Sequence, residues 1–539
     1  MKRMVTGALL LLAAIPAAAQ REEAVRAALY VTGAADPEEL DGQIVEELEA
    51  LLERPLQINR VTAARMVSSG LLTPYQAASL VDYRKTNGDV LSFRELELVD
   101  GFGADIVRIL RPFLSLSSRK PAGKASPDSL QAGVSAVLKG SLTGYGAKLR
   151  VTVGNGELAG ALKGPPGTGT FHACWETPAG RWTVGDYHVR FGQGLAFWSG
   201  FQLSGLSSPE AFSKRANGLT AAWSYNPSGT FRGLAWDGAR GRLQCTAFGF
   251  LSGGKPGGGA RVTFLGRHGH AGFAAASDGR LSLEGKYGYR GTDWFGECAM
   301  HLPDRAWAVL GGVGSPVGEH VRLVTRMCAV PRAYGGRKNG EYAAAAGLSW
   351  TSSDRLQAVS ATLEAALLPI PVQDPSRRQV KGVLMWSREQ GDWKWKARMN
   401  GRWRSYEKGR WDGRMDVGRT SGPWSINGRV NLVTSEQWGF LSYLEGGWKE
   451  EGWYVWGRLT FFRAESWADR IYCYERDAPG NFTVPAYYGT GGAISLVGGW
   501  KKRWRSRSLK CYLRASWLIR KEKPGQAGLK IQLMWDAQR

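Results

Sequence analysis

The stretch DWKWKARMNGRWR, residues 392–404, alternates between two kinds of side chain. Every second residue from Trp393 to Trp403 is apolar or small, and the residues between them are polar, all but Asn400 being basic. Successive side chains of a β-strand point to opposite faces of the sheet. The stretch therefore predicts a strand with one apolar face and one strongly basic face.

The same alternation recurs through much of the chain. In LKCYLRASWLIR, residues 509–520, Leu509 and Leu513 alternate with Lys510 and Arg514. A soluble sandwich would alternate too, but these segments run about 10 residues, the length that a tilted strand needs to cross a bilayer. Trp and Tyr also recur near the segment ends, as in the aromatic girdles of membrane barrels. The pattern predicts a transmembrane barrel, because only a closed barrel of strands satisfies every backbone polar group in lipid.

The first twenty residues predict export. Lys2 and Arg3 precede a short apolar run at residues 5–15, and three alanines at 17–19 form a small-residue cleavage site. This is the form of a secretory signal peptide, here residues 1–19. Together with the strand pattern, it predicts the outer membrane of a Gram-negative cell, with the part before the barrel in the periplasm.

The charge of the chain divides it into two parts. Residues 20–117 contain 10 Lys and Arg against 16 Asp and Glu, and the remainder of the mature chain contains 58 against 31. An acidic front and a basic body indicate separate domains. We expect a small all-α domain followed by a large antiparallel transmembrane β-barrel. The expected boundaries are a signal peptide at 1–19, a periplasmic helical domain at 20–115, a linker at 116–128 and a barrel at 129–539.

The acidic front has helical spacing. Apolar residues recur at helical intervals between Leu40 and Leu51, which predicts a helix capped by Asp36 with Pro37 in its first turn. Later helices are expected to begin at similar polar caps. Asn59 is the second expected cap and Ser92 is the third. Glu95 is the expected capping-box partner of Ser92.

Residues 56–114 contain two similar turns between helices. LVDGFGADIVRIL has glycines at 101 and 103, and SSGLLTPYQAASLV has Gly70 in the equivalent place. The pair resembles the tandem helix-hairpin-helix domains of the ComEA type. In that family the hairpin amides and a following basic residue hold a phosphate group. The resemblance implies four phosphate-contact candidates: Gly70, Gly101, Gly103 and Arg108.

The acidic front departs from the DNA-binding pattern. Asp105 follows the second glycine of the later hairpin, and Leu72 stands where the earlier hairpin needs its second glycine. DNA binding also relies on basic charge, and this part of the chain has an excess of acids. A module that docks on a periplasmic or outer-membrane protein is therefore favoured, with nucleic-acid binding as the alternative.

Loop lengths predict the topology of the barrel. If both termini are periplasmic, the long connections at 367–379 and 466–491 are extracellular and the turn within 500–507 is periplasmic. About 20 to 24 strands fit the basic body. A barrel of this width has a polar lumen. The inward basic residues predicted from the alternation are Lys394, Lys396, Arg398, Arg402, Arg404, Lys510 and Arg514.

These inward charges leave two interpretations open. They attract an anionic cargo such as nucleic acid, acidic sugars or an acidic protein segment, or they pair with one another and with an inner plug. The basic turn within 500–507 would face the acidic domain. We therefore expect that domain to dock on the periplasmic mouth of the barrel.

The stretch GDYHVRFGQGLAFWSG, residues 185–200, invites an active-site interpretation. His188 and Ser199 lack an orienting motif, the histidines at 268 and 270 lack further ligands at metal spacing, and the glycines match no nucleotide fingerprint. We expect no enzyme activity, catalytic residue, metal or cofactor. In a barrel the stretch predicts a strand that leads into a kinked, pore-shaping segment, with Asp186 and Arg190 paired or lining the lumen. The pore-shaping candidates are Gly185, Asp186, Arg190, Gly192, Gln193 and Gly194.

Several stretches together resemble one family. They are LLERPLQIN, LVDYRKTNGDVLSFRELELVDGFG, VGDYHVRFGQGLAFWSGF, KRANGLTAAWSY and YCYERDAPGNFTVPAYYGTGG. They resemble the helix-hairpin-helix outer-membrane β-barrel proteins of Bacteroidota, which implies architecture and location but no catalytic residues. We expect a barrel in outer-membrane lipid that serves passage or assembly of an anionic or macromolecular cargo, with the helical domain as a docking module. The alternative is a DNA-uptake component that uses the helical domain and the basic lumen.

Overall fold

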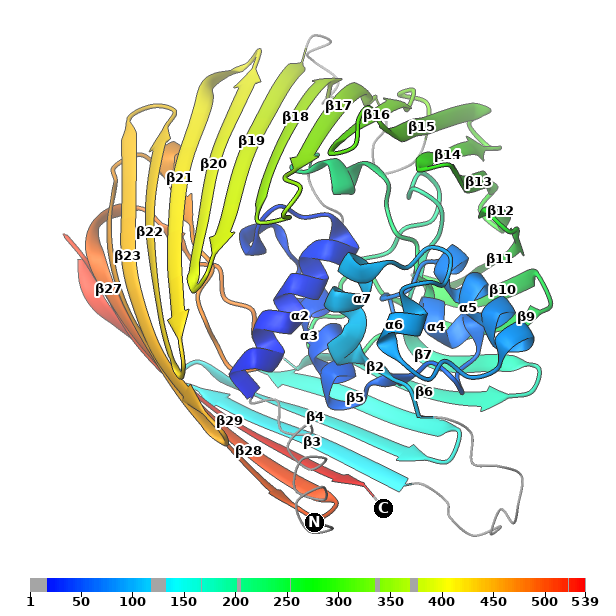
Figure 1. Ribbon diagram of the computed structural model, residues 1–539, viewed down its shortest axis with the longest axis horizontal. Coiled ribbons are helices and arrows are strands. Elements are labelled where there is room, and N and C mark those ends of the chain that lie inside the picture. Colours follow the sequence, from blue (N-terminus) through cyan, green and yellow to red (C-terminus); the bar gives the residue numbers. More distant parts are fainter. Residues whose placement is uncertain are drawn as a thin grey trace.

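The chain forms a β-barrel that encloses a set of helices (Figure 1). The computed structural model describes residues 17–117, 132–165, 167–200, 205–252, 254–334, 340–368, 377–521 and 523–538. Most of the expected signal peptide and of the expected linker lies outside these ranges. No helix within them is long and apolar enough to cross a membrane.

Twenty-four of the described strands close into one antiparallel barrel, the upper end of the expected range. Neighbouring strands along the chain pair with each other, and β29 pairs with β3 to complete the cylinder. The first half of the wall is β3 (Ala132–Ser141), β4 (Gly144–Val153), β5 (Gly156–Gly164), β6 (Thr168–Thr177), β7 (Gly180–Arg190), β9 (Phe231–Arg240), β10 (Leu243–Ser252), β11 (Lys255–Leu265), β12 (Gly269–Ala276), β13 (Arg280–Tyr289), β14 (Thr292–His301) and β15 (Ala306–Pro316). The second half is β16 (Val321–Ala329), β17 (Tyr342–Thr351), β18 (Gln357–Leu367), β19 (Arg378–Gln390), β20 (Trp393–Arg404), β21 (Glu407–Ser421), β22 (Trp424–Thr434), β23 (Trp438–Glu450), β24 (Trp453–Ala464), β27 (Gly489–Trp504), β28 (Arg507–Arg520) and β29 (Lys523–Gln538).

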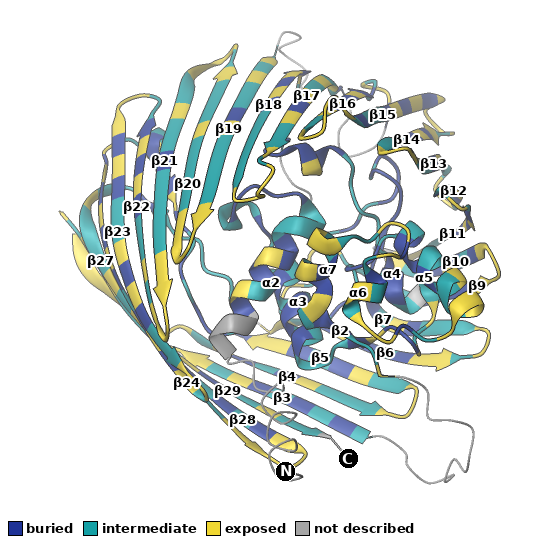
Figure 2. Cartoon of the chain, viewed as in Figure 1, coloured by how far each residue is buried: buried dark blue, intermediate teal, exposed yellow. Residues whose placement is uncertain are grey.

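The outer surface of the barrel is apolar. Leu513, Trp517 and Ile519 of β28 are 45%, 48% and 53% exposed, whereas Lys510 and Arg514 of the same strand are buried. Figure 2 shows buried and exposed residues alternating along the wall strands. An apolar belt between aromatic girdles on a closed antiparallel barrel places this protein in the outer membrane. The exposed tryptophans at or near strand ends include Trp393, Trp403, Trp411, Trp424, Trp438, Trp453 and Trp504.

The two ends of the barrel differ in their connections. At the end where β3 begins, the turns between wall strands are two to five residues long. At the opposite end, residues 191–230 and 465–488 form long connections, so the turn within 500–507 and the connection at 466–491 lie at opposite ends, as the sequence predicts. Short turns face the periplasm and long loops face outward in such barrels.

Residues 17–117 form a helical domain inside the barrel (Figure 1). Its own core packs Ile58, Met66, Leu80, Leu110 and Phe113, all fully buried. Its parallel strand pair β1 (Leu56–Gln57) and β2 (Leu114–Ser115) joins the two ends of this core. The helices are α2 (Ala17–Thr32), η1 (Pro37–Glu39), α3 (Gly42–Glu53), α4 (Ala63–Ser68), α5 (Pro74–Asn87), α6 (Phe93–Leu96), α7 (Ala104–Leu110) and η2 (Arg111–Phe113).

The helical domain contacts the periplasmic end of the barrel, where Asp105 pairs with Arg355, but it also reaches deeper than the expected docking on the mouth. α2 and α3 form a helical hairpin, the inserted hairpin, whose tip meets Arg398 and Arg414 near the middle of β20 and β21. An acidic hairpin can enter this far because it satisfies inward basic side chains that would otherwise be buried without partners. The contacts support the inner-plug alternative.

Asp36 stands at the N-cap position of η1, which begins at Pro37 as expected, but the Asp36 side chain makes no cap hydrogen bond. α3 begins at Gly42, and Asp41 caps it by accepting a hydrogen bond from the N–H of Gln43. Leu40 is extended, so the helix does not continue back to Asp36. Asp36 is therefore free to reach the barrel wall.

The second expected cap is wrong, and the third is confirmed. Thr62 caps α4, whereas the Asn59 side chain donates to the carbonyl of Val90 and accepts from its N–H, both at 2.9 Å. Ser92 caps α6 by accepting from the N–H of Glu95 at 3.1 Å. Local sequence does not distinguish a cap from a tertiary bridge, because the same side-chain groups make both.

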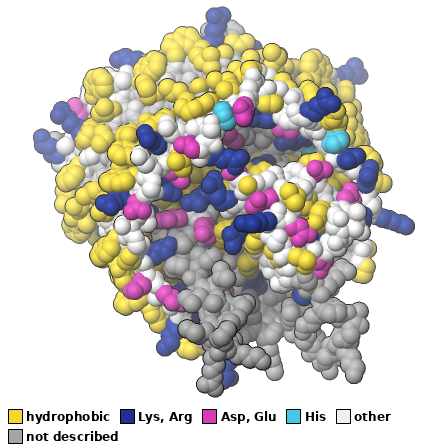
Figure 3. Space-filling model, viewed as in Figure 1, with side chains coloured by type: hydrophobic (Ala, Val, Ile, Leu, Met, Phe, Trp, Pro, Cys, Tyr) yellow, Lys and Arg dark blue, Asp and Glu magenta, His cyan; other side chains and the backbone are white. Residues whose placement is uncertain are grey.

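Two extracellular connections fold back into the lumen. The β7–β9 segment (191–200 and 205–230) contains η3 (Pro209–Phe212) and β8 (Gly218–Ala221), and the β24–β27 segment (465–488) contains η4 (Trp467–Asp469), β25 (Ile471–Tyr472) and β26 (Ala486–Tyr487). Ser208 of the first segment donates to the carbonyl of Gly33 at 2.6 Å, and Arg21 donates to that of Ala478 in the second at 2.7 Å. The lumen is thus occupied from both ends, and Figure 3 shows charged side chains gathered in the central hollow.

Candidate functional site

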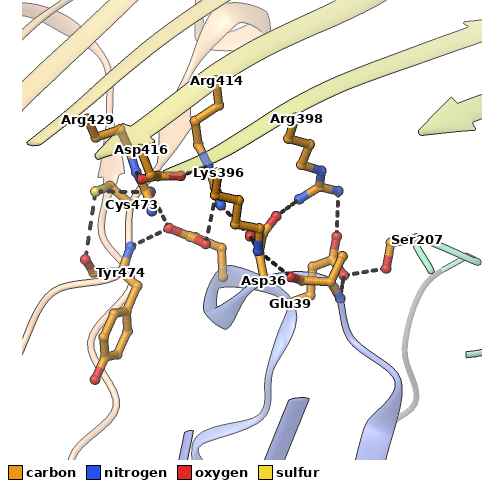
Figure 4. A network of polar contacts seen from close by, with 12 residues as sticks. Asp36, Glu39, Ser207, Lys396, Arg398, Arg414, Asp416, Arg429, Cys473 and Tyr474 are labelled. Carbon is orange, nitrogen blue, oxygen red and sulfur yellow. Dashed lines mark hydrogen bonds and ion pairs between the residues drawn. The ribbon is translucent and has the colours of Figure 1, made fainter. Parts of the chain in front are cut away.

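The tip of the inserted hairpin meets a basic patch on the barrel wall (Figure 4). The acidic tip consists of Asp36, Glu38 and Glu39. Asp36 is 0% exposed, and it accepts from Lys396 Nζ at 2.6 Å and from the guanidinium groups of Arg398 and Arg414. Arg398 also binds Glu39 at 2.7 Å. One carboxylate of the hairpin therefore holds three cations of the wall.

The other two acids connect the tip to the inward segments. Glu38 pairs with Arg429 Nη1 at 2.5 Å and accepts from the backbone N–H of Tyr474 in the β24–β27 segment at 3.0 Å. Glu39 accepts from Ser207 Oγ in the β7–β9 segment at 2.5 Å. The acidic tip thus joins the wall to both segments that enter from the outside.

Strand register assembles the basic side of this site. Arg398 of β20 stands opposite Arg414 of β21, and Asp416 of β21 stands opposite Arg429 of β22. Side chains at opposed positions on one face of a sheet are neighbours. We call the four basic residues the wall cluster: Lys396, Arg398, Arg414 and Arg429. Asp416 of the wall also binds two of them, Arg414 at 2.8 Å and Arg429 at 2.5 Å. The acidic tip neutralises the excess positive charge.

The carboxylates of Asp36 and Glu38 stay ionised. Burial alone would raise the pKa of Asp36, but Arg414 and Lys396 lower it well below its ordinary value. Burial acts in the same way on Glu38, and Arg429 and Arg414 lower its pKa to about 2. Nearby opposite charge outweighs desolvation at both groups. The contact therefore keeps its charge across physiological pH.

The predicted inward basic residues fall into two groups. Besides the two in the wall cluster, Lys510 binds Glu53 of α3 at 2.5 Å, and Arg514 lies 3.5 Å from Asp477 of the β24–β27 segment. These residues contact the contents of the lumen. The other three pair within the wall: Lys394 with Glu389, and Arg402 and Arg404 with Glu407.

The predicted kinked segment begins at Gly185. β7 pairs with β6 up to this residue, whose φ is 107°, and a Cβ there would lie 2.3 Å from the carbonyl oxygen of Phe171. Asp186 accepts from the Phe171 N–H at 2.8 Å and pairs with Arg232 at 2.8 Å. The expected pair with Arg190 is not formed, because Arg232 of β9 stands directly opposite Asp186. Arg190 lines a cavity in the lumen instead.

The GQG turn, residues 192–194, wraps around a carboxylate of the wall. Glu297 of β14 accepts from the N–H of Gln193 at 2.6 Å, of Leu195 at 3.1 Å and of Ala196 at 3.2 Å. Both glycines of the turn have positive φ, which lets the amides converge. This contact fixes the β7–β9 segment against the wall.

The first hairpin glycine faces the interior. Gly70 lies against Asn217 of the β7–β9 segment, and its N–H donates to the carbonyl of Val67 at 3.0 Å. That amide is therefore already used, and it does not offer the free donor that a phosphate needs.

The second hairpin lies at the periplasmic end. Gly101 and Gly103 have positive φ, and Arg108 is 3.6 Å from Asp105. Asp105 also pairs with Arg355 of a short barrel turn at 3.1 Å. The turn at 101–103 thus lies beside an acid that binds the barrel, and phosphate contact there stays a prediction.

The structure brings His188 and Ser199 together. His188 Nδ1 lies 3.3 Å from Ser199 Oγ, which accepts from the N–H of Val189 at 2.7 Å. Gln43 of α3 donates to His188 Nε2 at 2.7 Å. The three side chains join wall, inward segment and inserted hairpin. Among the described residues no group of three metal-binding side chains occurs.

Sequence reasoning does not find Asp36, Glu38 or Glu297 as functional residues. The pattern assigns Asp36 to a helix cap. A usable signal for its contact with the wall is the acidic run between two helices, because the predicted inward strands are basic. Glu297 has no such signal, because its partners lie about a hundred residues away and are backbone amides.

Comparison with known proteins adds little to this geometry. No family model and no curated protein matches the chain. It is similar to the structure "Copper transporter OprC" (9% identity, 78% of this chain, 82% of that chain, TM-score 0.42), to Pseudomonas aeruginosa OccK2 (9%, 76%, 97%, 0.32) and to the P pilus usher PapC translocation pore (8%, 76%, 99%, 0.35). The chain's own closed wall, apolar belt and polar lumen show an outer-membrane β-barrel.

Proposed function

We propose that this protein is an outer-membrane channel whose lumen is closed by its own inserted hairpin. The acidic tip carries the proposal, since Asp36 is fully buried against three basic side chains near the middle of the wall. A barrel of this strand number encloses a wide lumen unless something fills it. A contact built from charges is suited to release, because both partners regain hydration when they separate.

The chemistry of the wall cluster indicates the cargo. When the acidic tip leaves, Lys396, Arg398, Arg414 and Arg429 face the lumen together. Rings of basic side chains favour anions in a pore. In the closed state, the acidic tip occupies the place that the carboxylates or phosphates of an anionic or macromolecular cargo would take in the open channel.

The rest of the helical domain supports a docking role. Its resemblance to a tandem helix-hairpin-helix domain at 56–114, and of the whole chain to the barrel proteins of Bacteroidota, stays a prediction. Leu91 and Leu98 are 76% and 82% exposed in this part of the chain, which does not face lipid. Exposed apolar residues of this kind fit a periplasmic protein partner that draws the hairpin out.

The test is the conductance of the full chain in planar bilayers. Asp36→Asn removes the carboxylate that Lys396, Arg398 and Arg414 share, although Arg398 keeps Glu39 and Arg414 keeps Glu38 and Asp416. Breaking a buried pair by removing one partner costs about 3–5 kcal/mol. We expect the variant to open far more often than the wild type, with anion selectivity. Asp82→Asn, which changes an exposed acid of α5, is the matched control and should stay closed. An Asp36→Asn channel as silent as the wild type would exclude the proposal, provided that both run alike as folded barrels on gels.

A further inference from the structure

A cavity of about 100 Å³ lies where the inserted hairpin, the β7–β9 segment and the barrel wall meet. We call it the junction cavity. Ser69 and Gly70 of the first hairpin turn form part of its lining. This volume has room for a molecule of several non-hydrogen atoms. Its charged lining residues are Arg190, Lys214, Arg215, Arg326, Glu47 and Glu364.

Two of the arginines have unused donors. Arg190 is 4% exposed, and its Nε donates to the carbonyl of Ser199 at 3.2 Å, but its Nη2 has no hydrogen-bond partner among the described residues. Nη1 of Arg215 also has none there, while its guanidinium carbon lies 4.0 Å from the ring centre of Tyr30. A buried charged donor without an acceptor is costly. Both groups therefore favour an anion in the cavity.

The acids of the cavity do not satisfy these donors. Burial raises the pKa of Glu47, although Arg190 opposes the rise, so Glu47 is poorly suited to carry a full charge. Oε2 of Glu364 has no hydrogen-bond partner among the described residues. The cavity contains four basic and two acidic side chains, which leaves it electropositive.

The remaining lining is largely apolar, with Thr32, Ser69 and Asn217 as its uncharged polar members. Val31, Ile44 and Leu48 of the inserted hairpin face Leu206 and Ala211 of the β7–β9 segment across this space. An inorganic oxyanion would leave these surfaces without contacts. We propose that the junction cavity binds a small organic monocarboxylate with a short branched apolar body, its carboxylate accepting from Arg190 and Arg215.

Such a ligand would act on the closed state. Because hairpin, segment and wall all contribute lining residues, the complete cavity exists only while the hairpin is seated. A ligand that binds one of two states stabilises that state by mass action. This consequence rests on the proposed function, whereas the binding itself does not.

Calorimetry on the full chain in detergent tests the binding, with isovalerate as the probe. We expect isovalerate to bind, and the neutral amide isovaleramide and inorganic phosphate to bind at least tenfold more weakly. Arg190→Gln and Arg215→Gln should each weaken isovalerate at least tenfold. Val31→Phe, which fills the apolar side without removing a charge, should abolish binding. The exposed Arg94→Gln of α6 is the control and should bind as the wild type does.

Several results would overturn this proposal. They are no binding of isovalerate, equal binding of the amide or of phosphate, and equal losses in Arg190→Gln and Arg94→Gln. The wild-type comparison of acid with amide decides the charge requirement even if one variant does not fold. The two proposals fail separately. If isovalerate binds through Arg190 but the Asp36→Asn channel stays closed, only the proposed function is refuted. If the Asp36→Asn channel opens but isovalerate does not bind, only this site is refuted.

Discussion

Single buried charges position whole segments of this protein. Arg21 donates to the carbonyls of Asp477 and Asn481, and it orders the β24–β27 segment from within the lumen. Glu297 does the same for the β7–β9 segment through three backbone N–H groups. Charge-assisted hydrogen bonds are stronger than neutral ones, and a backbone donor that loses its acceptor pays the full cost of desolvation.

At this scale we predict that Glu297→Gln loosens the β7–β9 segment. The amide has one acceptor oxygen and sets an NH2 group against backbone N–H donors, which costs about 2 kcal/mol. Limited proteolysis within 205–230 should then proceed about 30-fold faster than in the wild type. Glu319→Gln, in an exposed turn, is the control. Equal cleavage rates for both variants would show that Glu297 does not hold the segment.

Among the elements, α3 carries a titratable contact to an inward segment. Glu49 accepts from the N–H of Gly480 at 2.6 Å, and Arg21 lies 3.9 Å away. Burial raises the pKa of Glu49 to about 7, although Arg21 opposes the rise. A carboxyl group with a higher pKa in the seated hairpin binds a proton on seating. Seating therefore weakens as pH rises from the ordinary value of 4.5 to about 7, and it changes no further above that.

We predict that the inserted hairpin is released more readily at pH 8 than at pH 5. The difference in seating free energy attributable to Glu49 is at most about 3 kcal/mol. Protease cleavage between α2 and α3, or the open probability of the channel, measures it. Glu49→Gln should reduce the dependence in this window, to which Glu47 of the same helix also contributes because burial raises its pKa, and Asp82→Asn should retain it in full. A Glu49→Gln protein with the same pH profile as the wild type would contradict the assignment.

The whole molecule consists of two bodies with different sources of stability. The wall is a closed ladder of 24 strands without free edges, whereas the helical domain has a separate small core. The contacts described between them are mainly hydrogen bonds and ion pairs, such as Asp36 with Arg414 and Glu53 with Lys510. Multidomain proteins of this kind need not unfold in one step.

We predict two unfolding transitions in urea. The helical circular dichroism signal should be lost at a lower urea concentration than the compact gel migration of the folded barrel, because the closed wall has no edge from which to open. Asp36→Asn should move only the first transition to lower urea. A single transition seen by both measurements would show that the two bodies unfold together.

The sequence by itself determined the wall of this protein and the side of it that each residue faces. Alternation along residues 392–404 and 509–520 predicts the lipid face and the inward basic side chains, because strand geometry repeats every two residues. Helical spacing and the charge imbalance predict a separate acidic domain. Only the tertiary structure decided that this domain enters the lumen, that Asp36 binds the wall cluster and that Glu297 holds the GQG turn. These contacts join residues from about one hundred to nearly four hundred positions apart, and no local periodicity records which distant charges a closed barrel brings together.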